Sequence, residues 1–423
     1  MREILDEVDR LAEELIELCR SLVRINTVNP YAGAGITGIE GDGQAFIQPL
    51  LVEMGGQTQL FEPPADIFAR MGAIGPKDRQ WKGRPNLVTR FDLGPGKRII
   101  INSHMDTVGV ADMDFDPFCA DLRNGTIFGR GSSDDKGGIA MGIIAIKAVL
   151  KFADAISGTI IHQSVVDEEC SGSGAGTLAC CLEGYDADEA IVIDGQGLTV
   201  TRGCQGCLTA DVTVLGKGGH AALGGVNAID KAVIITNAID RFKRAREANY
   251  PDCLVNLGIF NAGTHAAVVP ASAKLSLNIV YAIEEALANE QATGTWDGSS
   301  VRRAFADAIH EAGESDDWMR DHPAQVEWVK DLVPFETPED APVVRGLCTA
   351  YQATLAEAPE VDIMNAWGDA ANMMRYGGVP AVFFGPGTPG KSHAQDETVE
   401  VDDLVKGAKV IAAYLYQQLA KQS

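Results

Sequence analysis

Histidine and acidic residues follow several apolar stretches of the chain, and the first such pair is His104 and Asp106, after the apolar run 98–101. Residues two apart in an extended chain lie on the same face. Asp106 can therefore accept a hydrogen bond from the imidazole nitrogen of His104 that does not face a metal, which fixes the tautomer and raises the basicity of the ligand nitrogen. The pair indicates a metal ligand with its orienting carboxylate. A polar strand end is the simpler alternative for His104 alone.

Four acidic residues later in the chain also lie next to apolar segments and are further candidates for metal binding or catalysis. Asp134 and Asp135 lie in a glycine-rich turn before an apolar helix, where acids also occur simply because they favour a helix N-terminus. Glu168 and Glu169 follow the apolar strand 158–166, and a solvated acidic turn is the alternative there. Acids that converge in a buried place raise one another's pKa unless cations compensate them. Because successive side chains diverge, one glutamate can bind a metal while the other acts as a base.

Two further candidates follow short apolar strands. Asp194 ends the strand 190–193, and His393 lies in a loop rich in glycine and proline after the strand 380–384. Each alone is explained as a turn or loop residue. Together they follow strands of one predicted sheet, and ligands of open α/β sheets collect outside the carboxyl ends of the strands. Two histidines with three or four carboxylates suit two divalent ions such as zinc, with one carboxylate bridging them.

The elements that must position these residues alternate between apolar strands and helices up to about residue 202. Such alternation is typical of an α/β layer with a largely parallel central sheet. The expected elements of this part are 87–91, 98–103, 139–152, 158–166, 174–182 and 190–193. The end of the chain returns to the same pattern with 343–355, 380–384 and 401–419.

The stretch after about residue 202 has a different pattern. The segments 208–215 and 274–280 alternate apolar and polar residues, as half-exposed strands do. One-sided strands interspersed with helices indicate a small α+β domain of ordinary size. We therefore predict a metal-binding catalytic domain formed by residues 1–203 and 332–423, into which a smaller domain, 204–331, is inserted.

Composition supports this organisation and narrows the class of partner. A chain of 423 residues exceeds one ordinary core, so two domains are expected. Its 35 basic and 59 acidic residues give a net charge of -24, which disfavours nucleic acids and anionic membrane surfaces as partners. We expect a small-molecule substrate instead.

The same composition predicts a cytoplasmic protein. Residues 1–23 have a charged amphipathic pattern rather than the apolar core of a secretory signal, and no apolar run of membrane-spanning length follows. Nine scattered cysteines, an odd number, indicate reduced thiols rather than a disulfide framework. Cys204 and Cys207 form a lone C-x-x-C without the second pair that a zinc ribbon needs.

The pattern as a whole resembles a known family, the two-zinc amidohydrolases and metallopeptidases that include aminoacylase, acetylornithine deacetylase, succinyl-diaminopimelate desuccinylase and glutamate carboxypeptidase. The resemblance runs over nearly the whole chain. The segments that carry it are 103–108, 116–118, 129–137, 167–169, 216–220, 225–229, 269–270 and 385–397. It implies a zinc-peptidase-like α/β catalytic domain with a mixed, largely parallel sheet, and an inserted α+β domain that serves as lid and dimerisation domain.

The resemblance also implies a role for each candidate residue. His104 and Asp194 would hold one metal, and Glu169 and His393 would hold the other. Asp134 would bridge the two, because it is the aspartate two before Lys136, and Asp135 would then be no ligand. The remaining catalytic roles would fall to Glu168 as general base, Asp106 as the orienter of His104, and His220 as the lid residue that stabilises the oxyanion, in this family often from the other subunit of a dimer.

The chain departs from the family pattern where the substrate is held. Gly109 and Met113 replace a usual proline and tryptophan beside the first motif. The strand 274–281 lacks the arginine that often grips the substrate carboxylate, and Ala267 replaces an asparagine. The substrate could therefore lack the usual α-carboxylate, or another cation such as Arg202 could bind it, with His265 as a partial substitute for the asparagine.

The resulting prediction is a metal-dependent hydrolase that cleaves the amide bond of an N-acyl amino acid or a related small molecule, as acetylornithine deacetylase does. A dipeptidase or carboxypeptidase of the same family is the alternative within the class. A non-catalytic binding module is the alternative outside it. Two divalent ions are expected as cofactors, zinc first, with cobalt or manganese as alternatives. A homodimer through the lid domain is expected as the assembly.

Overall fold

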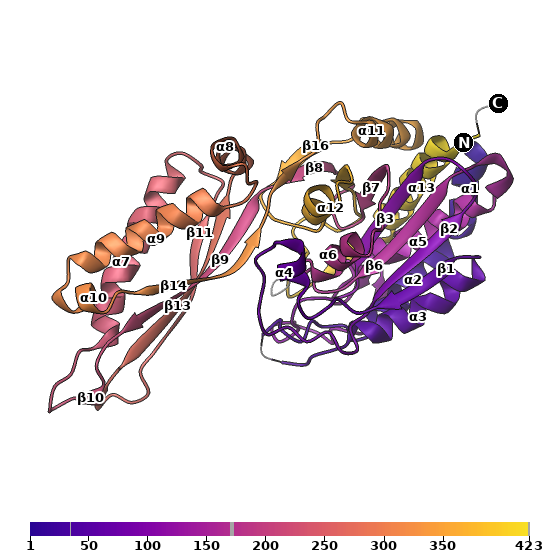
Figure 1. Cartoon of the computed structure of the whole chain (residues 1–423). Helices are drawn as coiled ribbons and strands as arrows, with labels where there is room; N and C mark the ends of the chain where they lie inside the picture. Colours follow the sequence, from indigo (N-terminus) through magenta and orange to yellow (C-terminus); the bar gives the residue numbers. More distant parts are fainter. Residues whose placement is uncertain (34, 170–172, 422–423) are drawn as a thin grey trace.

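A computed structural model describes residues 1–423 of the chain except 34, 170–172 and 422–423. The described chain forms two parts, each built on its own sheet (Figure 1). The larger part contains a sheet of nine strands in the order β1-β2-β6-β3-β7-β17-β8-β15, with β16 paired to β8. Their bounds are β1 Gln57–Phe61, β2 Asn86–Asp92, β6 Thr159–Val165, β3 Arg98–His104, β7 Glu189–Val192, β17 Ala381–Phe383, β8 Val200–Cys204, β15 Phe335–Glu336 and β16 Val361–Met364.

The centre of this sheet is parallel. The adjacent strands β6, β3, β7 and β17 run parallel to one another. The pairs β1–β2, β2–β6, β17–β8 and β15–β8 are antiparallel. Ile99, Ile100 and Ile101 of β3 are buried, as the two covered faces of a parallel sheet require. The predicted mixed, largely parallel sheet is confirmed.

Helices cover both faces of the nine-stranded sheet. One face packs against the largest apolar core, to which α5 contributes most of its length because it is buried nearly all round. The helices of that core are α1 Arg2–Arg10, α2 Ala12–Val23, α3 Glu40–Glu53, α5 Lys136–Leu150, α11 Pro342–Leu355 and α13 Val401–Leu419. The other face carries α4 Ile67–Met71, α6 Ala175–Leu182 and α12 Ala370–Tyr376. A small sheet of β4 Asp121–Arg123, β5 Thr126–Phe128 and β18 Thr398–Glu400, and the 3-10 helix η1 Ala153–Ala155, complete this part.

The second part, called the lid here, is a four-stranded antiparallel sheet in the order β11-β13-β9-β14. Residues of β9 alternate between buried and half-buried, because helices cover only one face. The prediction of a second, smaller α+β domain is confirmed, and its sheet is antiparallel. Its elements are β9 Gly206–Leu215, β10 Gly219–His220, α7 Ala228–Glu247, β11 Val255–Ala262, β12 Val268–Val269, β13 Ser272–Tyr281, α8 Ile283–Thr293, α9 Ser299–Glu314, α10 Asp317–Asp321 and β14 Gln325–Leu332.

The lid has its own apolar core, made of residues between 208 and 328 such as Leu208, Leu275 and Phe305. β10 and β12 form a two-stranded extension at the end of the lid that lies far from the larger part (Figure 1). The chain passes from one part to the other at two places, between β8 and β9 and between β14 and β15.

A loop of the larger part also contacts the lid. The N–H of Asp331 in β14 donates to the carbonyl of Ile74 at 3.1 Å, and Lys77 pairs with Glu327 at 2.7 Å. On another side, the Arg375 guanidinium of α12 lies 3.4 Å from the centre of the Trp296 ring of the lid. These contacts join the lid to the larger part on two sides, and Lys77 and Glu327 also line the cavity described below.

The sequence contains no apolar run of membrane-spanning length, and the helices can be compared with this prediction. Among the helices of the described residues, none combines the length and apolar content that crossing a bilayer requires.

Candidate metal centre

The predicted ligands lie at the carboxyl ends of neighbouring strands. His104 is the last residue of β3, and Glu168 and Glu169 follow its parallel neighbour β6. Asp194 follows β7, which pairs with β3 on the other side. His393 and Asp134 come from the loop after β17 and the turn before α5. Because these strands are parallel, their polar ends meet at one edge of the sheet.

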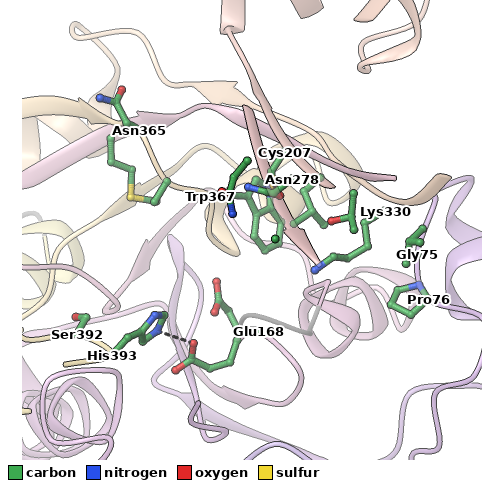
Figure 2. Close-up of a pocket in the computed structure, with 18 of the residues that line it drawn as sticks. Gly75, Pro76, Glu168, Cys207, Asn278, Lys330, Asn365, Trp367, Ser392 and His393 are labelled. Carbon is green, nitrogen blue, oxygen red and sulfur yellow. Dashed lines mark hydrogen bonds and ion pairs between the residues drawn. The ribbon is translucent and has the colours of Figure 1, made fainter. Parts of the chain in front are cut away.

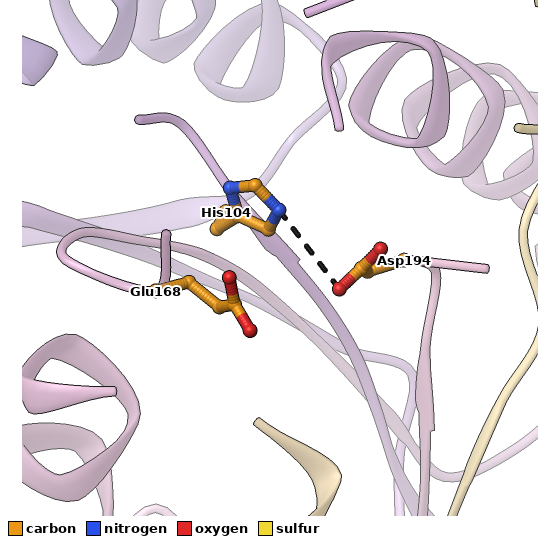
Figure 3. Close-up of side chains that lie close together, drawn as sticks. All are labelled: His104, Glu168 and Asp194. Carbon is orange, nitrogen blue, oxygen red and sulfur yellow. Dashed lines mark ion pairs between the residues drawn. The ribbon is translucent and has the colours of Figure 1, made fainter. Parts of the chain in front are cut away.

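Two groups of side chains there can each hold a metal ion. His104, Asp134 and Glu169 form one group, and His104, Glu168 and Asp194, drawn in Figure 3, form the other. In each group the ligand atoms lie within 4.8 Å of one another. Imidazole nitrogens and carboxylate oxygens are the donors that zinc accepts. The residues present therefore fit a pair of divalent cations.

Asp134 lies between the two imidazoles. Its Oδ1 is 2.9 Å from Nε2 of His104, and its Oδ2 is 3.3 Å from Nε2 of His393. His393 Nε2 also lies 2.8 Å from Oε2 of Glu169, and His104 Nε2 lies 3.9 Å from Oδ2 of Asp194. Each oxygen of Asp134 thus faces a different histidine, which is the geometry that a bridging carboxylate needs.

The electrostatics of the cluster also favour bound cations. Burial, reinforced by the charge of Asp134, raises the pKa of Glu169 to about 7 and the pKa of Asp194 to about 6. Burial also raises the pKa of Glu168 well above its usual range, although its side chain is partly exposed to the cavity. For Asp134, burial opposes ionisation, but hydrogen bonds from His104 and His393 outweigh it and hold its pKa below its usual range. Four acids with only two imidazoles among them are short of positive charge, which divalent cations would supply.

Asp106 contacts His104 through its backbone carbonyl, whereas the sequence predicted a contact through its carboxylate. The backbone carbonyl of Asp106 lies 3.0 Å from Nδ1 of His104, whereas its carboxylate oxygen Oδ1 is 3.7 Å away. The carboxylate instead accepts the backbone N–H of Glu168 and of Glu169, each at 3.1 Å, and the side-chain N–H of Asn29 at 2.8 Å. The carboxylate is already occupied by the loop after β6, so the imidazole bonds to the carbonyl. Asp106 orients both the histidine and the two glutamates.

Asp135 is buried at the start of α5 and has no side-chain cap bond. Its Oδ2 accepts the N–H of His104 at 3.3 Å. Asp135 thus contacts the backbone of His104, and the prediction that it is no ligand stays a prediction.

The reasoning from sequence missed a second layer of supporting residues. Glu397 accepts the N–H groups of Ser133 and Asp134 at 3.0 and 3.2 Å and pairs with Arg130. Glu397 does belong to the last motif noted in the sequence, but its partners are over 260 residues away, so no local pattern indicates them.

A buried cluster behind the loop after β6 was also missed. Arg84 bonds Glu40 and, at 3.1 Å, Asp167, whose backbone has a positive φ of 65°. These buried ion pairs fix the turn from which Glu168 and Glu169 project.

The two lid histidines considered from the sequence, His220 and His265, lie outside the centre within one chain. His220 is exposed on β10 at the far end of the lid, and its Nδ1 accepts the N–H of Ala222 at 3.2 Å. His265 is exposed and accepts the N–H of Ala267 at 3.1 Å. Neither lines the cavity described next. The role of His220 stays a prediction about a dimer.

A cavity of about 1380 Å³ lies between the predicted metal ligands and the lid (Figure 2). Its floor includes Asp134, Glu168, Glu169, Asp194 and His393. Its roof is the uncovered face of the lid sheet, where Asn278 of β13, Thr209 of β9 and Lys330 of β14 are cross-strand neighbours.

Comparison with known proteins agrees with this site. The model of peptidase family M20/M25/M40 matches residues 100–417. An N-formyl-4-amino-5-aminomethyl-2-methylpyrimidine deformylase from Bacillus subtilis is 27% identical over 97% of this chain and 95% of its own. A putative succinyl-diaminopimelate desuccinylase from Mycobacterium tuberculosis is 24% identical over 78% of this chain and 85% of its own.

Solved structures share the fold. A di-peptidase from Saccharomyces cerevisiae superposes with a TM-score of 0.75 at 16% identity, covering 98% of this chain and 97% of its own. The family match spans most of the chain, including every predicted metal ligand, and confirms the resemblance seen in the motifs. The chain belongs to peptidase family M20/M25/M40 and is a hydrolase of that family.

Proposed function

We propose that this protein is a metal-dependent amide hydrolase that removes a small acyl group, formyl first, from an amine without an α-carboxylate. The observation that carries the proposal is the meeting of two candidate metal groups at His104, one of which includes Glu168, on the floor of a large cavity. If Asp134 and His393 complete the two ligand sets, Glu168 is left to act as a base.

The proposed ligands follow the geometry. His104 and Asp194 would hold one cation, Glu169 and His393 the other, and Asp134 would bridge them. Zinc suits these donors, and cobalt or manganese would also be accepted. When bound, such a pair polarises the scissile carbonyl and makes water a better nucleophile at neutral pH.

Glu168 is the proposed general base. Its backbone N–H is fixed by Asp106 at 3.1 Å, and its side chain reaches the cavity. Burial raises its pKa well above the usual range, so the carboxylate accepts a proton readily. It would take the proton of the attacking water and deliver it to the leaving nitrogen, which would otherwise be a poor leaving group.

The roof of the cavity supports a substrate without an α-carboxylate. The pocket-facing side chains of β13 are those of Lys274, Ser276 and Asn278, with no arginine among them, and Lys274 is paired with Asp211 at 2.7 Å. Arg202, the substitute considered from the sequence, pairs with Glu336 and does not line the cavity.

The deformylase relative agrees with this reading. The substrate in its name carries a formamide on an aminomethyl group of a pyrimidine and has no carboxylate. Lys330 and Arg79 also line the cavity, and they favour a second candidate, a deacylase of N-acyl amino acids whose carboxylate these cations would bind.

A substrate panel tests the proposal. Purified protein loaded with zinc would be assayed against N-formyl aminomethyl heterocycles, N-formyl, N-acetyl and N-succinyl amino acids, and dipeptides. The proposal expects kcat/KM to be at least tenfold higher for the carboxylate-free formamides. Preference for the amino acid derivatives would select the second candidate, and exclusive cleavage of dipeptides would establish a peptidase instead.

The exposed end of the lid bears on the assembly of the protein. We infer a cytoplasmic homodimer formed through the lid, in which His220 of one protomer serves the cavity of its partner. The exposed position of His220 at the far end of the lid supports this arrangement.

A further inference from the structure

One wall of the cavity is an aromatic face. Trp367 lines the cavity from the segment between β16 and α12 and is half-buried. Its indole N–H donates to the carbonyl of Val333 at 3.0 Å, at the point where the chain returns from the lid. The polar edge of the ring thus has its hydrogen-bond partner, and the bond holds that edge at the segment between β14 and β15.

Trp367 differs from the other tryptophans in having no ring or cation partner among the described residues. Each of the other four has one. Their pairs are Trp81 with Arg84 at 5.3 Å, Trp296 with Arg375 at 3.4 Å, Trp318 with His322 at 3.8 Å and Trp328 with Phe305 at 5.8 Å. A fixed ring that faces a cavity without such a partner is a stacking surface for a ligand.

A hydrogen-bond donor lies on the lid side of the cavity, on β13. Asn278 is exposed on β13, and its side-chain oxygen accepts the thiol of Cys207 at 2.7 Å. This bond occupies the carbonyl side of the amide, and the amide nitrogen has no partner among the described residues. Asn278 therefore presents N–H groups to the cavity, where they match an acceptor such as an aromatic ring nitrogen.

Trp367 and Asn278 both lie on the lid side of Glu168 (Figure 2). In the view of Figure 2, the Trp367 side chain lies between the Glu168 carboxylate and the pair Cys207 and Asn278. Met364 and Phe383 also line the cavity and add a thioether and a second ring. Soft, flat walls of this kind pack best on a planar group.

We propose that Trp367 and Asn278 recognise a planar nitrogen heterocycle on the amine half of the substrate, Trp367 by stacking on its face and Asn278 by donating to a ring nitrogen. The inference rests on the proposed amide hydrolysis, because it assumes that the scissile amide lies at Glu168. It adds the class of amine and the residues that select it.

Three formamides separate the two contributions. N-formyl-5-aminomethylpyrimidine is flat and carries ring nitrogens, N-formylbenzylamine is flat without them, and N-formylcyclohexylmethylamine is neither. The zinc-loaded wild-type protein is expected to prefer them in that order, by about tenfold at each step, as one stacked pair and one neutral hydrogen bond would give. Specificity is measured as the ratio of kcat/KM values.

Variants assign each step to its residue. Trp367→Leu is expected to reduce the benzyl over cyclohexylmethyl ratio about tenfold, and Trp367→Phe to retain most of it. Asn278→Leu is expected to reduce the pyrimidine over benzyl ratio about tenfold. The matched control is Trp318→Leu, which changes a tryptophan stacked on His322 in the lid and is expected to change neither ratio.

A binding measurement provides a second readout. Free 5-aminomethylpyrimidine is expected to quench the tryptophan fluorescence of the wild-type protein, and Trp367→Phe is expected to abolish that quenching. This variant keeps an aromatic ring in place, so it serves even if Trp367→Leu does not fold.

The outcomes distinguish the two proposals. If the wild-type protein cleaves none of the three formamides, the proposed function is wrong. If it cleaves all three with similar kcat/KM, or if the Trp367 and Asn278 variants lower all three values in proportion, the heterocycle inference is wrong while amide hydrolysis stands.

Discussion

The backbone N–H of Glu168 donates to the carboxylate of Asp106 at 3.1 Å. The same carboxylate accepts the N–H of Glu169, and the carbonyl of Asp106 accepts from the ring of His104. One buried residue therefore positions the proposed base and one proposed ligand of each metal.

Replacing Asp106 by asparagine tests this linkage. The amide has one acceptor oxygen where the carboxylate has two, so one of the two glutamate N–H groups would lose its partner. Since supporting residues of metal sites typically contribute 10- to 100-fold in activity or metal affinity, we expect Asp106→Asn to lower kcat/KM by about that factor. Steady-state kinetics with metal titration measures it. The exposed Asp121→Asn is the control, and an Asp106→Asn enzyme with wild-type kinetics and affinity would contradict the role.

Glu168→Gln separates the base from the ligands. Glutamine cannot take a proton from water, so turnover is expected to fall by roughly 10²- to 10⁴-fold, the range that general base catalysis contributes. Metal content is expected to stay near two ions per chain, because the proposed ligand set is untouched. Elemental analysis and kinetics on the same sample check both points, with Glu183→Gln as control. A variant that lost one ion would show that Glu168 is a ligand, as its place in the second metal group permits.

Removing the metals is expected to destabilise the protein. The acids Asp134, Glu169 and Asp194 converge on two imidazoles, and without cations their mutual repulsion is uncompensated. Binding at a thousandfold excess over Kd stabilises a fold by about 4 kcal/mol per site. Chelation should therefore lower Tm measurably, and added zinc should restore it. Asp194→Asn should reduce the loss on chelation, and an unchanged Tm after verified removal of metal would contradict the prediction.

His162 is expected to make the fold sensitive to acid independently of the metal centre. Its ring is fully buried in β6, neither ring nitrogen has a hydrogen-bond partner among the described residues, and burial lowers its pKa from 6.5 to about 4. Between pH 6.5 and about 4, His162 is protonated in the unfolded chain but stays neutral in the folded chain. Stability is therefore lost as pH falls from 6.5 to about 4, by up to roughly 3 kcal/mol.

The variant His162→Leu should lose less stability than the wild-type protein over that pH range. Denaturant midpoints measured at pH 7 and pH 4.5 test this, with the exposed His310→Gln as control. Parallel losses in the wild-type protein and His162→Leu would exclude His162 as a source of acid sensitivity.

His220 can be tested by complementation. In a mixture of Glu168→Gln and His220→Ala chains, a mixed dimer contains one site with intact Glu168 that receives His220 from the partner. Random reassortment makes half of the dimers mixed, so about a quarter of wild-type activity should return. Activity assays before and after subunit exchange measure it. No recovery, although mixed dimers form, would place the action of His220 within one chain or outside catalysis.

Most of the proposed metal ligands were accessible from the sequence because they follow apolar strands, and the parallel order of β6, β3, β7 and β17 brings the strand ends together. Asp134 was indicated instead by the glycine-rich turn before α5. The edge strand β1 was not predicted, since Gln57, Thr58 and Gln59 are exposed or half-exposed and show no apolar alternation.

The remaining features depend on contacts between distant residues. The bond from Trp367 to Val333 joins positions that no local pattern connects. The same holds for the bonds by which Glu168 and Glu169 occupy the carboxylate of Asp106, so that its carbonyl faces His104. Such relationships follow from tertiary packing rather than from periodicity.

The two crossings between the parts lie next to each other, because Cys204 at the end of β8 pairs with Phe335 at the start of β15. The lid is therefore connected to the larger part through two adjacent antiparallel strands, β8 and β15. A tight turn linking Cys204 to Phe335 would close the nine-stranded sheet without the lid, and the same two points define where the lid of one family member can be exchanged for that of another. Such chimaeras would move a substrate preference between proteins while leaving the metal ligands in place.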